Sequence, residues 1–216
     1  MFDVILFDLD GTLTDPSEGI TNSVIYALKK FGIEVEDKRT LLKFIGPPLV
    51  KGFAEFYGFS HADSLKATEF YRETFRVKGL FENKVYDGIY EMLQVLKNAG
   101  KTLVIATSKP EEFTLKILKH FDLLKYFDFV PAATFDETRN TKDKVIAYAL
   151  EHLNVSDKSK IVMVGDRYHD IEGAKANGIS SIGVLYGFAP DGELEECPHV
   201  YLAKNAEELY NYISTR

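Results

Sequence analysis

Short hydrophobic runs alternate along the chain with segments in which hydrophobic residues recur at helical spacing. Each run is almost continuously hydrophobic, as expected of a strand that is covered on both faces of a sheet. The expected strands are DVILF (3–7), TLVIA (102–106), FDFVP (127–131), KIVMV (160–164), SIGVL (181–185) and HVYLA (199–203). Between them, one helix is expected over Ile89 to Leu96, ending at Gly100, and another over Val145 to Leu153. This alternation predicts an α/β fold with a doubly wound parallel sheet.

The stretch between the first two expected strands is too long for a simple crossover. It takes roughly ninety residues, whereas a crossover needs only a few tens. Hydrophobic residues at helical spacing run from Ile20 to Phe31, ending at Gly32, and from Leu65 to Phe75. We therefore expect a small α-helical domain at 16–83, inserted into a core made of 1–15 and 84–216.

Composition narrows the classes of partner. The chain has 26 basic and 33 acidic residues, a net charge of −7, and no stripe of lysine and arginine that could follow a nucleic-acid backbone. Its single cysteine, Cys197, cannot form an internal disulfide, and no signal segment or long hydrophobic span is present. We expect a cytoplasmic protein without a nucleic-acid or membrane partner.

Polar residues follow several of the expected strands. In a parallel sheet the carboxyl ends of the strands meet at one edge, where ligands bind. The candidates there are Asp8 and Asp10 after the first strand, Thr107 and Ser108 after the second, Asp166 and Asp170 after the fourth, and Lys142 or Lys144 before the 145–153 helix. We expect these groups to line a single crevice.

Up to four carboxylates in this crevice would face one or two lysines. Like charges that lie so close are unfavourable unless they are protonated or bound to a metal ion. An oxygen-only ligand set without histidine or cysteine favours Mg²⁺. At the end of a strand, residues i and i+2 point the same way, so one carboxylate of the pair Asp8 and Asp10 can attack while its neighbour transfers protons.

Together these segments resemble the four motifs of the haloacid dehalogenase superfamily, in its phosphatase branch. The motifs are DLDGTLTD (8–15), the threonine of VIATSK, a lysine ahead of a helix, and GDRYHD (165–170). The resemblance covers nearly the whole chain, and the insertion stands where that superfamily has a helical cap. Within the branch, GTLTDPSEGITNSVIYALKKFG and IGPPL make the chain similar to phosphoglycolate phosphatases and bacterial nucleotidases.

The resemblance implies roles for the acidic residues. Asp8 is implied to be the nucleophile that forms an aspartyl-phosphate, and Asp10 the general acid and base. Mg²⁺ is implied to bind Asp8, Asp166 and the backbone carbonyl of Asp10, with Asp170 behind these ligands.

The resemblance also implies a phosphate site. Thr107, the amide of Ser108 and the amide of Gly11 or Leu9 are implied to hold phosphoryl oxygens, and Lys142 to add positive charge. Spacing alone does not separate Lys142 from Lys144.

Structural roles are alternatives for the same residues. Asp8, Asp10 and Asp166 could belong to turns, Thr107 and Ser108 could cap a helix starting near Lys109, and Asp170 could be an N-cap residue. The two lysines could be a solvated helix start. In the inserted domain, the aromatic cluster around Phe53 is expected to be core rather than a platform for stacking a base. Basic residues there could be a solvated face or could contact the substrate, and the candidates are Lys43, Lys51, Arg72 and Arg76.

The substrate is expected to be a small phosphorylated metabolite, either phosphoglycolate or a nucleoside 5′-monophosphate. A β-phosphoglucomutase-like isomerase is less favoured because no histidine follows the DGT segment. A phosphonate hydrolase and a non-catalytic binding protein stay open. A dehalogenase is disfavoured because it would not need Asp10 as proton donor.

Overall fold

The structure, a computed structural model, describes residues 1–136, 138–153, 155–199 and 201–215. The chain forms two compact units, one made of Met1–Thr14 and Val85–Arg216 and the other of Asp15–Lys84. The two units are described separately below.

A parallel five-stranded sheet forms the centre of the larger unit. Its strand order is β4-β1-β7-β8-β9, and each strand runs parallel to its neighbours. The strands are β1 (Val4–Phe7), β4 (Thr102–Ile105), β7 (Ile161–Gly165), β8 (Ser180–Val184) and β9 (Tyr201–Ala203). The predicted α/β fold with a parallel sheet is confirmed. Val200, in the run that predicted the last strand, lies outside the described residues.

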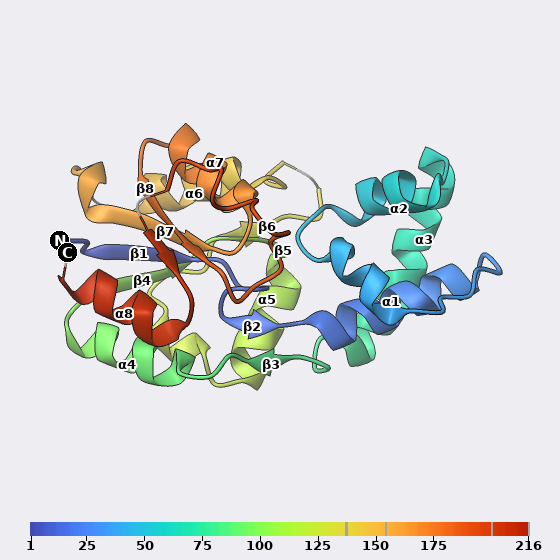
Figure 1. Ribbon diagram of the computed structural model, residues 1–216, viewed down its shortest axis with the longest axis horizontal. Coiled ribbons are helices and arrows are strands. Elements are labelled where there is room, and N and C mark those ends of the chain that lie inside the picture. Colours follow the sequence, from blue (N-terminus) through green and yellow to red (C-terminus); the bar gives the residue numbers. More distant parts are fainter. Residues whose placement is uncertain (137, 154, 200, 216) are drawn as a thin grey trace. The chain divides into compact units, whose positions relative to one another are not determined.

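Helices cover both faces of this sheet (Figure 1). They are α4 (Ile89–Asn98), α5 (Glu111–His120), α6 (Lys142–His152), α7 (Tyr168–Ala176) and α8 (Ala206–Thr215). Leu6 and Met163 of the sheet share a buried cluster with Val145 of α6 and Ala174 of α7, on one face. In Figure 1, α4 and α8 lie on the other face. Burial of each large apolar side chain contributes about 1.5–3 kcal/mol to the stability of the fold. Because all four residues of β1 are buried, the backbone that precedes Asp8 is held firmly in place.

The expected strand at 127–131 is wrong as a continuous strand. Phe129 makes a single parallel bridge to Val104, and Asp128 uses its side chain to accept from the N–H of Leu103 at 2.9 Å. Pro131 has no N–H to donate, so the ladder cannot continue regularly. The next residues pair instead, because β6 (Ala132–Ala133) runs beside β5 (Thr107–Pro110).

Short elements complete the larger unit and the connection between the units. The 3-10 helices η3 (Leu124–Tyr126) and η4 (Lys158–Lys160) lie in the larger unit. Strands β2 (Thr14–Asp15) and β3 (Lys84–Val85) pair at the two points where the chain passes from one unit to the other.

The smaller unit is helical. It contains α1 (Ser17–Lys29), η1 (Lys38–Phe44), α2 (Leu49–Tyr57), α3 (His61–Thr74) and the π-helical turn η2 (Phe75–Gly79). Phe53 is fully buried, and its ring lies 5.0 Å from that of Phe44, so the aromatic cluster contributes to the core as expected. The predicted stripe of α3 is wrong at Leu65, which is 45% exposed, because Ser64 and Ala67 occupy the buried face.

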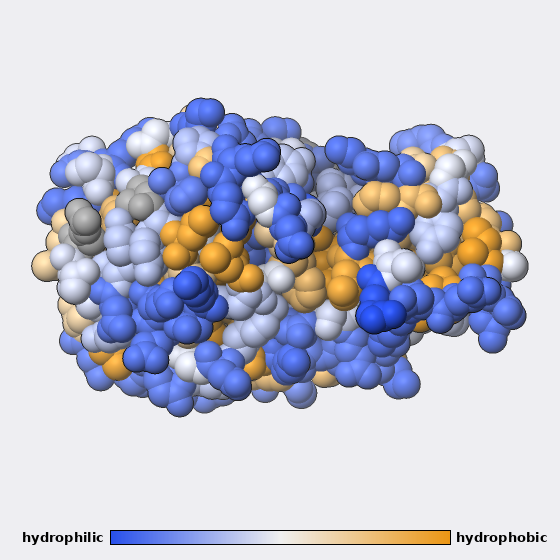
Figure 2. All heavy atoms as spheres, in the orientation of Figure 1, coloured by the Kyte–Doolittle hydropathy of each residue, from blue (hydrophilic) through white to orange (hydrophobic). Residues whose placement is uncertain are grey.

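In the described part of the chain, no helix is both long enough and apolar enough to cross a bilayer. Hydrophilic residues cover most of the visible face and hydrophobic ones form separate patches (Figure 2). This mixture is ordinary for a folded domain.

Candidate active site

The first site residue directly follows β1, which is paired on both sides. The backbone N–H of Asp8 continues that pairing by donating to the carbonyl of Val164 at 2.9 Å. Asp8 is half-buried at the carboxyl end of the strand, where α/β sheets bind their ligands. Its side chain therefore projects from a firmly held backbone.

A tight turn after Asp8 brings the chain close to Asp166. Gly11 has a φ of +82°, and its N–H donates to the carbonyl of Thr14 at 2.7 Å. A Cβ at Gly11 would lie 2.0 Å from Asp166 Oδ2, so both the backbone conformation and the available space require glycine.

Asp166 follows β7, and Asp170 lies in the first turn of α7. Both residues are 1% exposed. The N–H of Phe188 donates to Asp166 Oδ2 at 2.8 Å, whereas Asp166 Oδ1 is buried without a hydrogen-bond partner. Asp170 accepts from the N–H of Arg167 at 3.1 Å. The alternative that Asp170 is the N-cap residue is wrong, because Arg167 holds that position and Asp170 is the third helical residue.

Lys142 joins two of these carboxylates. Its ammonium lies 2.8 Å from Asp8 Oδ1 and 2.7 Å from Asp170 Oδ1, and it donates to the carbonyl of Ala106 at 2.8 Å. Lys142 is buried at the first position of α6, while Lys144 is exposed. The structure thus places Lys142 among the carboxylates and leaves Lys144 exposed.

Thr107 and Ser108 lie in β5 rather than at a helix start. Helix α5 begins at Glu111 after Pro110, and no side chain caps it, so the capping alternative for Thr107 and Ser108 is wrong. Thr107 is buried, and its Oγ1 accepts from the N–H of Lys109 at 3.2 Å. Residues at i and i+2 of a strand share a side, which places Thr107 and Lys109 together.

Asp10 has a lysine partner that the sequence did not reveal. The ammonium of Lys109 lies 2.5 Å from Asp10 Oδ2, and the two side chains are 6% and 17% exposed. Lys109 directly follows the candidates Thr107 and Ser108. It was not selected because a helix was expected to start there, whereas the residues form strand β5, in which Lys109 is buried.

Burial among like charges shifts the protonation of the site. Desolvation, and then the charges of Asp170 and Asp8, raise the pKa of Asp166 well above its usual range. Burial raises the pKa of Asp170 to about 6, although Lys142 opposes the rise. Burial also raises the pKa of Asp10 against the opposing effect of Lys109. Burial alone would lower the pKa of Lys142, but Asp170 and Asp8 outweigh it and raise that pKa.

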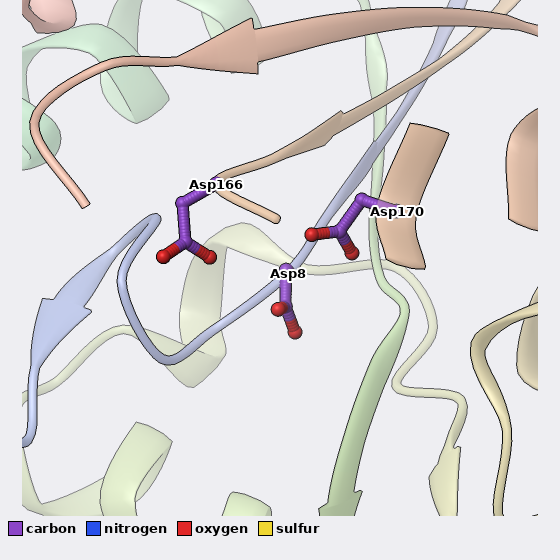
Figure 3. A group of neighbouring side chains, drawn as sticks. All are labelled: Asp8, Asp166 and Asp170. Carbon is purple, nitrogen blue, oxygen red and sulfur yellow. The ribbon is translucent and has the colours of Figure 1, made fainter. Parts of the chain in front are cut away.

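The residues present fit a metal ion. Asp8, Asp166 and Asp170 each offer an oxygen, and these oxygens lie within 4.8 Å of one another (Figure 3). The unpartnered Asp166 Oδ1 is a buried acceptor that a cation would satisfy. The carboxylate of Asp10 is outside this group, and its Oδ2 pairs with Lys109.

The four candidates for substrate contacts belong to the smaller unit. Lys43 and Lys51 are exposed, and the ammonium of Lys43 lies 4.5 Å from the centre of the Phe56 ring. Arg72 is partly buried in α3, and Arg76 is exposed in η2.

Comparison with known families decides the class of the chain. A family model described as haloacid dehalogenase-like hydrolase matches residues 5–184. The chain belongs to this family. The resemblance drawn from the four motifs is thereby confirmed.

Relatives refine this result. A 5′-nucleotidase of Pseudomonas aeruginosa is 47% identical over 190 residues, which cover 88% of this chain and 86% of the relative. A crystal structure of a predicted phosphatase from Clostridium acetobutylicum is 47% identical, covers 100% of both chains and superposes with a TM-score of 0.95. The tyrosine-protein kinase PtkA of Mycobacterium tuberculosis is 37% identical over 86% of this chain, which spans 62% of the length of that relative. The predicted class of enzyme, a phosphatase of the haloacid dehalogenase-like family, is confirmed at this level.

Proposed function

We propose that the protein is a Mg²⁺-dependent phosphomonoester hydrolase that acts through an aspartyl-phosphate on Asp8. The observation that carries the proposal is the convergence of Asp8, Asp166 and Asp170, whose oxygens lie within 4.8 Å of one another, with Lys142 bound to two of them. Lys142 balances part of the negative charge of this cluster, and Asp166 Oδ1 has no hydrogen-bond partner. A divalent cation would satisfy that oxygen and would allow a dianionic substrate to bind beside the carboxylates.

In the first half-reaction, a carboxylate oxygen of Asp8 attacks phosphorus and the bond from phosphorus to the ester oxygen breaks. Asp10 gives its proton to the departing alkoxide. Lys142, the hydroxyl of Thr107 and the amide of Ser108 hold the phosphoryl oxygens on which negative charge develops. Mg²⁺, when bound, supplies positive charge that reduces the repulsion between Asp8 and the phosphate.

In the second half-reaction, Asp10 takes a proton from a water molecule, whose oxygen attacks phosphorus. The bond between phosphorus and Asp8 breaks, inorganic phosphate leaves and the Asp8 carboxylate is restored. Asp10 thus gives up a proton in the first half-reaction and regains one in the second.

Two substrate classes follow from the resemblance and the relatives. Phosphoglycolate represents small phosphorylated acids, and nucleoside 5′-monophosphates are favoured by the name of the Pseudomonas relative. We assign residues 16–83 as the cap that selects among them, with Lys43, Lys51, Arg72 and Arg76 as candidate contacts. The cytoplasmic location stays a prediction from the sequence.

The test is phosphate release from phosphoglycolate, nucleoside monophosphates and sugar phosphates, with Mg²⁺ or with EDTA. The matched control is Asp8→Asn, which keeps the shape of the side chain and removes the nucleophile. We expect Mg²⁺-dependent release from at least one class and a loss of at least about 10³-fold in the variant. Phosphate release that persists in Asp8→Asn would contradict the proposal. A folded wild type that releases phosphate from none of these esters would also contradict it, and would favour a mutase, a phosphonatase or a binding protein instead.

A further inference from the structure

The two aspartates of the DxD pair each have a lysine of their own. Lys142 binds Asp8, while Lys109 binds Asp10 Oδ2 from a different element, β5. The proposed chemistry uses Lys142 on the phosphoryl group and leaves Lys109 without a role.

Lys109 is held at both of its ends. Its strand pairs with β6, and its own N–H donates to Thr107 Oγ1 at 3.2 Å. Its ammonium is 2.5 Å from Asp10, and the Lys109 side chain is 6% exposed. A lysine loses much rotamer freedom when it is buried, so this arrangement is maintained against an entropic cost.

The contact engages one oxygen of Asp10 and leaves the other free of protein partners. Asp10 Oδ2 takes the ammonium, whereas Asp10 Oδ1 is buried without a hydrogen-bond partner. A proton donor needs one oxygen available to the leaving group and a side chain that does not rotate. The pairing provides both conditions.

Thr107 and Lys109 are the two buried residues of β5 and share one side of it. One short strand therefore carries a hydroxyl expected at the phosphate and the ammonium that fixes Asp10. This couples the position of the proton donor to the position of the phosphoryl group.

We propose that Lys109 is a positioning residue, which holds Asp10 Oδ2 so that Asp10 Oδ1 meets the leaving-group oxygen. The inference rests on the proposed phosphatase function and deepens it. Lys109 acts through Asp10 and makes no contact of its own with the substrate.

The test uses aryl and alkyl phosphates whose leaving groups differ in basicity. Good leaving groups such as 4-nitrophenolate depart without a proton, whereas alkoxides need one. In Lys109→Met we expect kcat/KM to fall about 10- to 100-fold for alkyl phosphates and by less than about threefold for 4-nitrophenyl phosphate. Lys119→Met removes an exposed lysine of α5 and is the matched control, with no expected change in this dependence.

A second comparison keeps the proposal testable if Lys109→Met does not fold. In the Asp10→Asn background the proton donor is already lost, so adding Lys109→Met should lower kcat/KM by less than about twofold. A further fall of about tenfold or more in the double variant would overturn the positioning role.

The remaining outcomes separate this inference from the proposed function. An equal fall for every leaving group, with a raised KM, would show that Lys109 binds the phosphate itself and would overturn the inference while the phosphatase stands. Failure of the wild type on the whole series would overturn both, and it would be seen before any variant is made.

Discussion

Removing the ammonium of Lys142 is expected to destabilise the metal-free protein strongly. The change Lys142→Met keeps the length and apolar stem of the side chain and removes only its charge and donors. Lys142 and Asp170 have side chains 4% and 1% exposed, and that of Asp8 is 13% exposed. The variant therefore leaves two carboxylates in the interior without their cation.

The magnitude follows from this burial. Removing one partner of a buried ion pair costs about 3–5 kcal/mol, because the remaining charge has lost its solvent and its counter-ion. That range includes the lost donor to the Ala106 carbonyl, itself worth about 1 kcal/mol. We expect a loss of about 3–5 kcal/mol at pH 7 in EDTA, and a smaller loss near pH 5, where protonation of Asp170 removes one of the charges.

Urea unfolding followed by circular dichroism measures this difference. The matched control is Lys144→Met, two residues further along α6, where the exposed side chain should contribute less than about 0.5 kcal/mol. A loss below about 1 kcal/mol in Lys142→Met, at an unchanged m-value, would refute the reasoning, because it would show that these carboxylates do not depend on Lys142.

Three further predictions address the same cluster. Gly187→Ala should lower the free energy of unfolding in urea by about 1–3 kcal/mol, because its Cβ would lie 2.3 Å from Asp166 Cβ and 2.5 Å from the Gly11 carbonyl oxygen. An unchanged free energy of unfolding would show that the loop around Gly187 can move to make room for the methyl group. Asp166→Asn should raise the metal-free stability, because it removes the cost of burying the Asp166 carboxylate among like charges, which is also what raises its pKa. The same variant should abolish stabilisation by Mg²⁺, which in the wild type reaches about 2.7 kcal/mol at 100 times Kd. A thermal melt with Mg²⁺ or EDTA measures both effects, and a variant still protected by Mg²⁺ would exclude Asp166 as a ligand. In EDTA, the free energy of unfolding should rise as pH falls from 7 towards 5, more in the wild type than in Asp170→Asn, because Asp170 binds a proton in the folded state with a pKa of about 6, above its unfolded value; identical pH profiles would contradict this assignment.

Much of the sheet could be predicted from the sequence because its strands are buried on both faces. β1 and β7 appear as continuous hydrophobic runs, and the residues after them were candidates because parallel strands end at one edge. The segment 127–131 has the same hydrophobic character, but Asp128 and Pro131 interrupt its hydrogen-bonded ladder. A pattern of hydrophobic residues does not reveal such an interruption.

Details of the site that depend on long-range contacts could not be predicted. The spacing of Lys142 and Lys144 was ambiguous, and only the packing of α6 buries one of them against the carboxylates. Lys109 was hidden because Pro110 was interpreted as a helix start, whereas β5 continues through it. The roles of Gly11 and Gly187 were equally invisible, because both depend on how closely distant segments approach Asp166.

The central claim is that Asp8 carries the phosphoryl group during turnover. The most direct measurement is an acid quench during turnover in Mg²⁺, followed by borohydride reduction, which converts an aspartyl-phosphate to homoserine, and by peptide mass spectrometry. The account predicts homoserine at position 8, dependent on both substrate and Mg²⁺. Phosphate release with an unmodified Asp8, or with the modification on another residue such as Asp10, would contradict it.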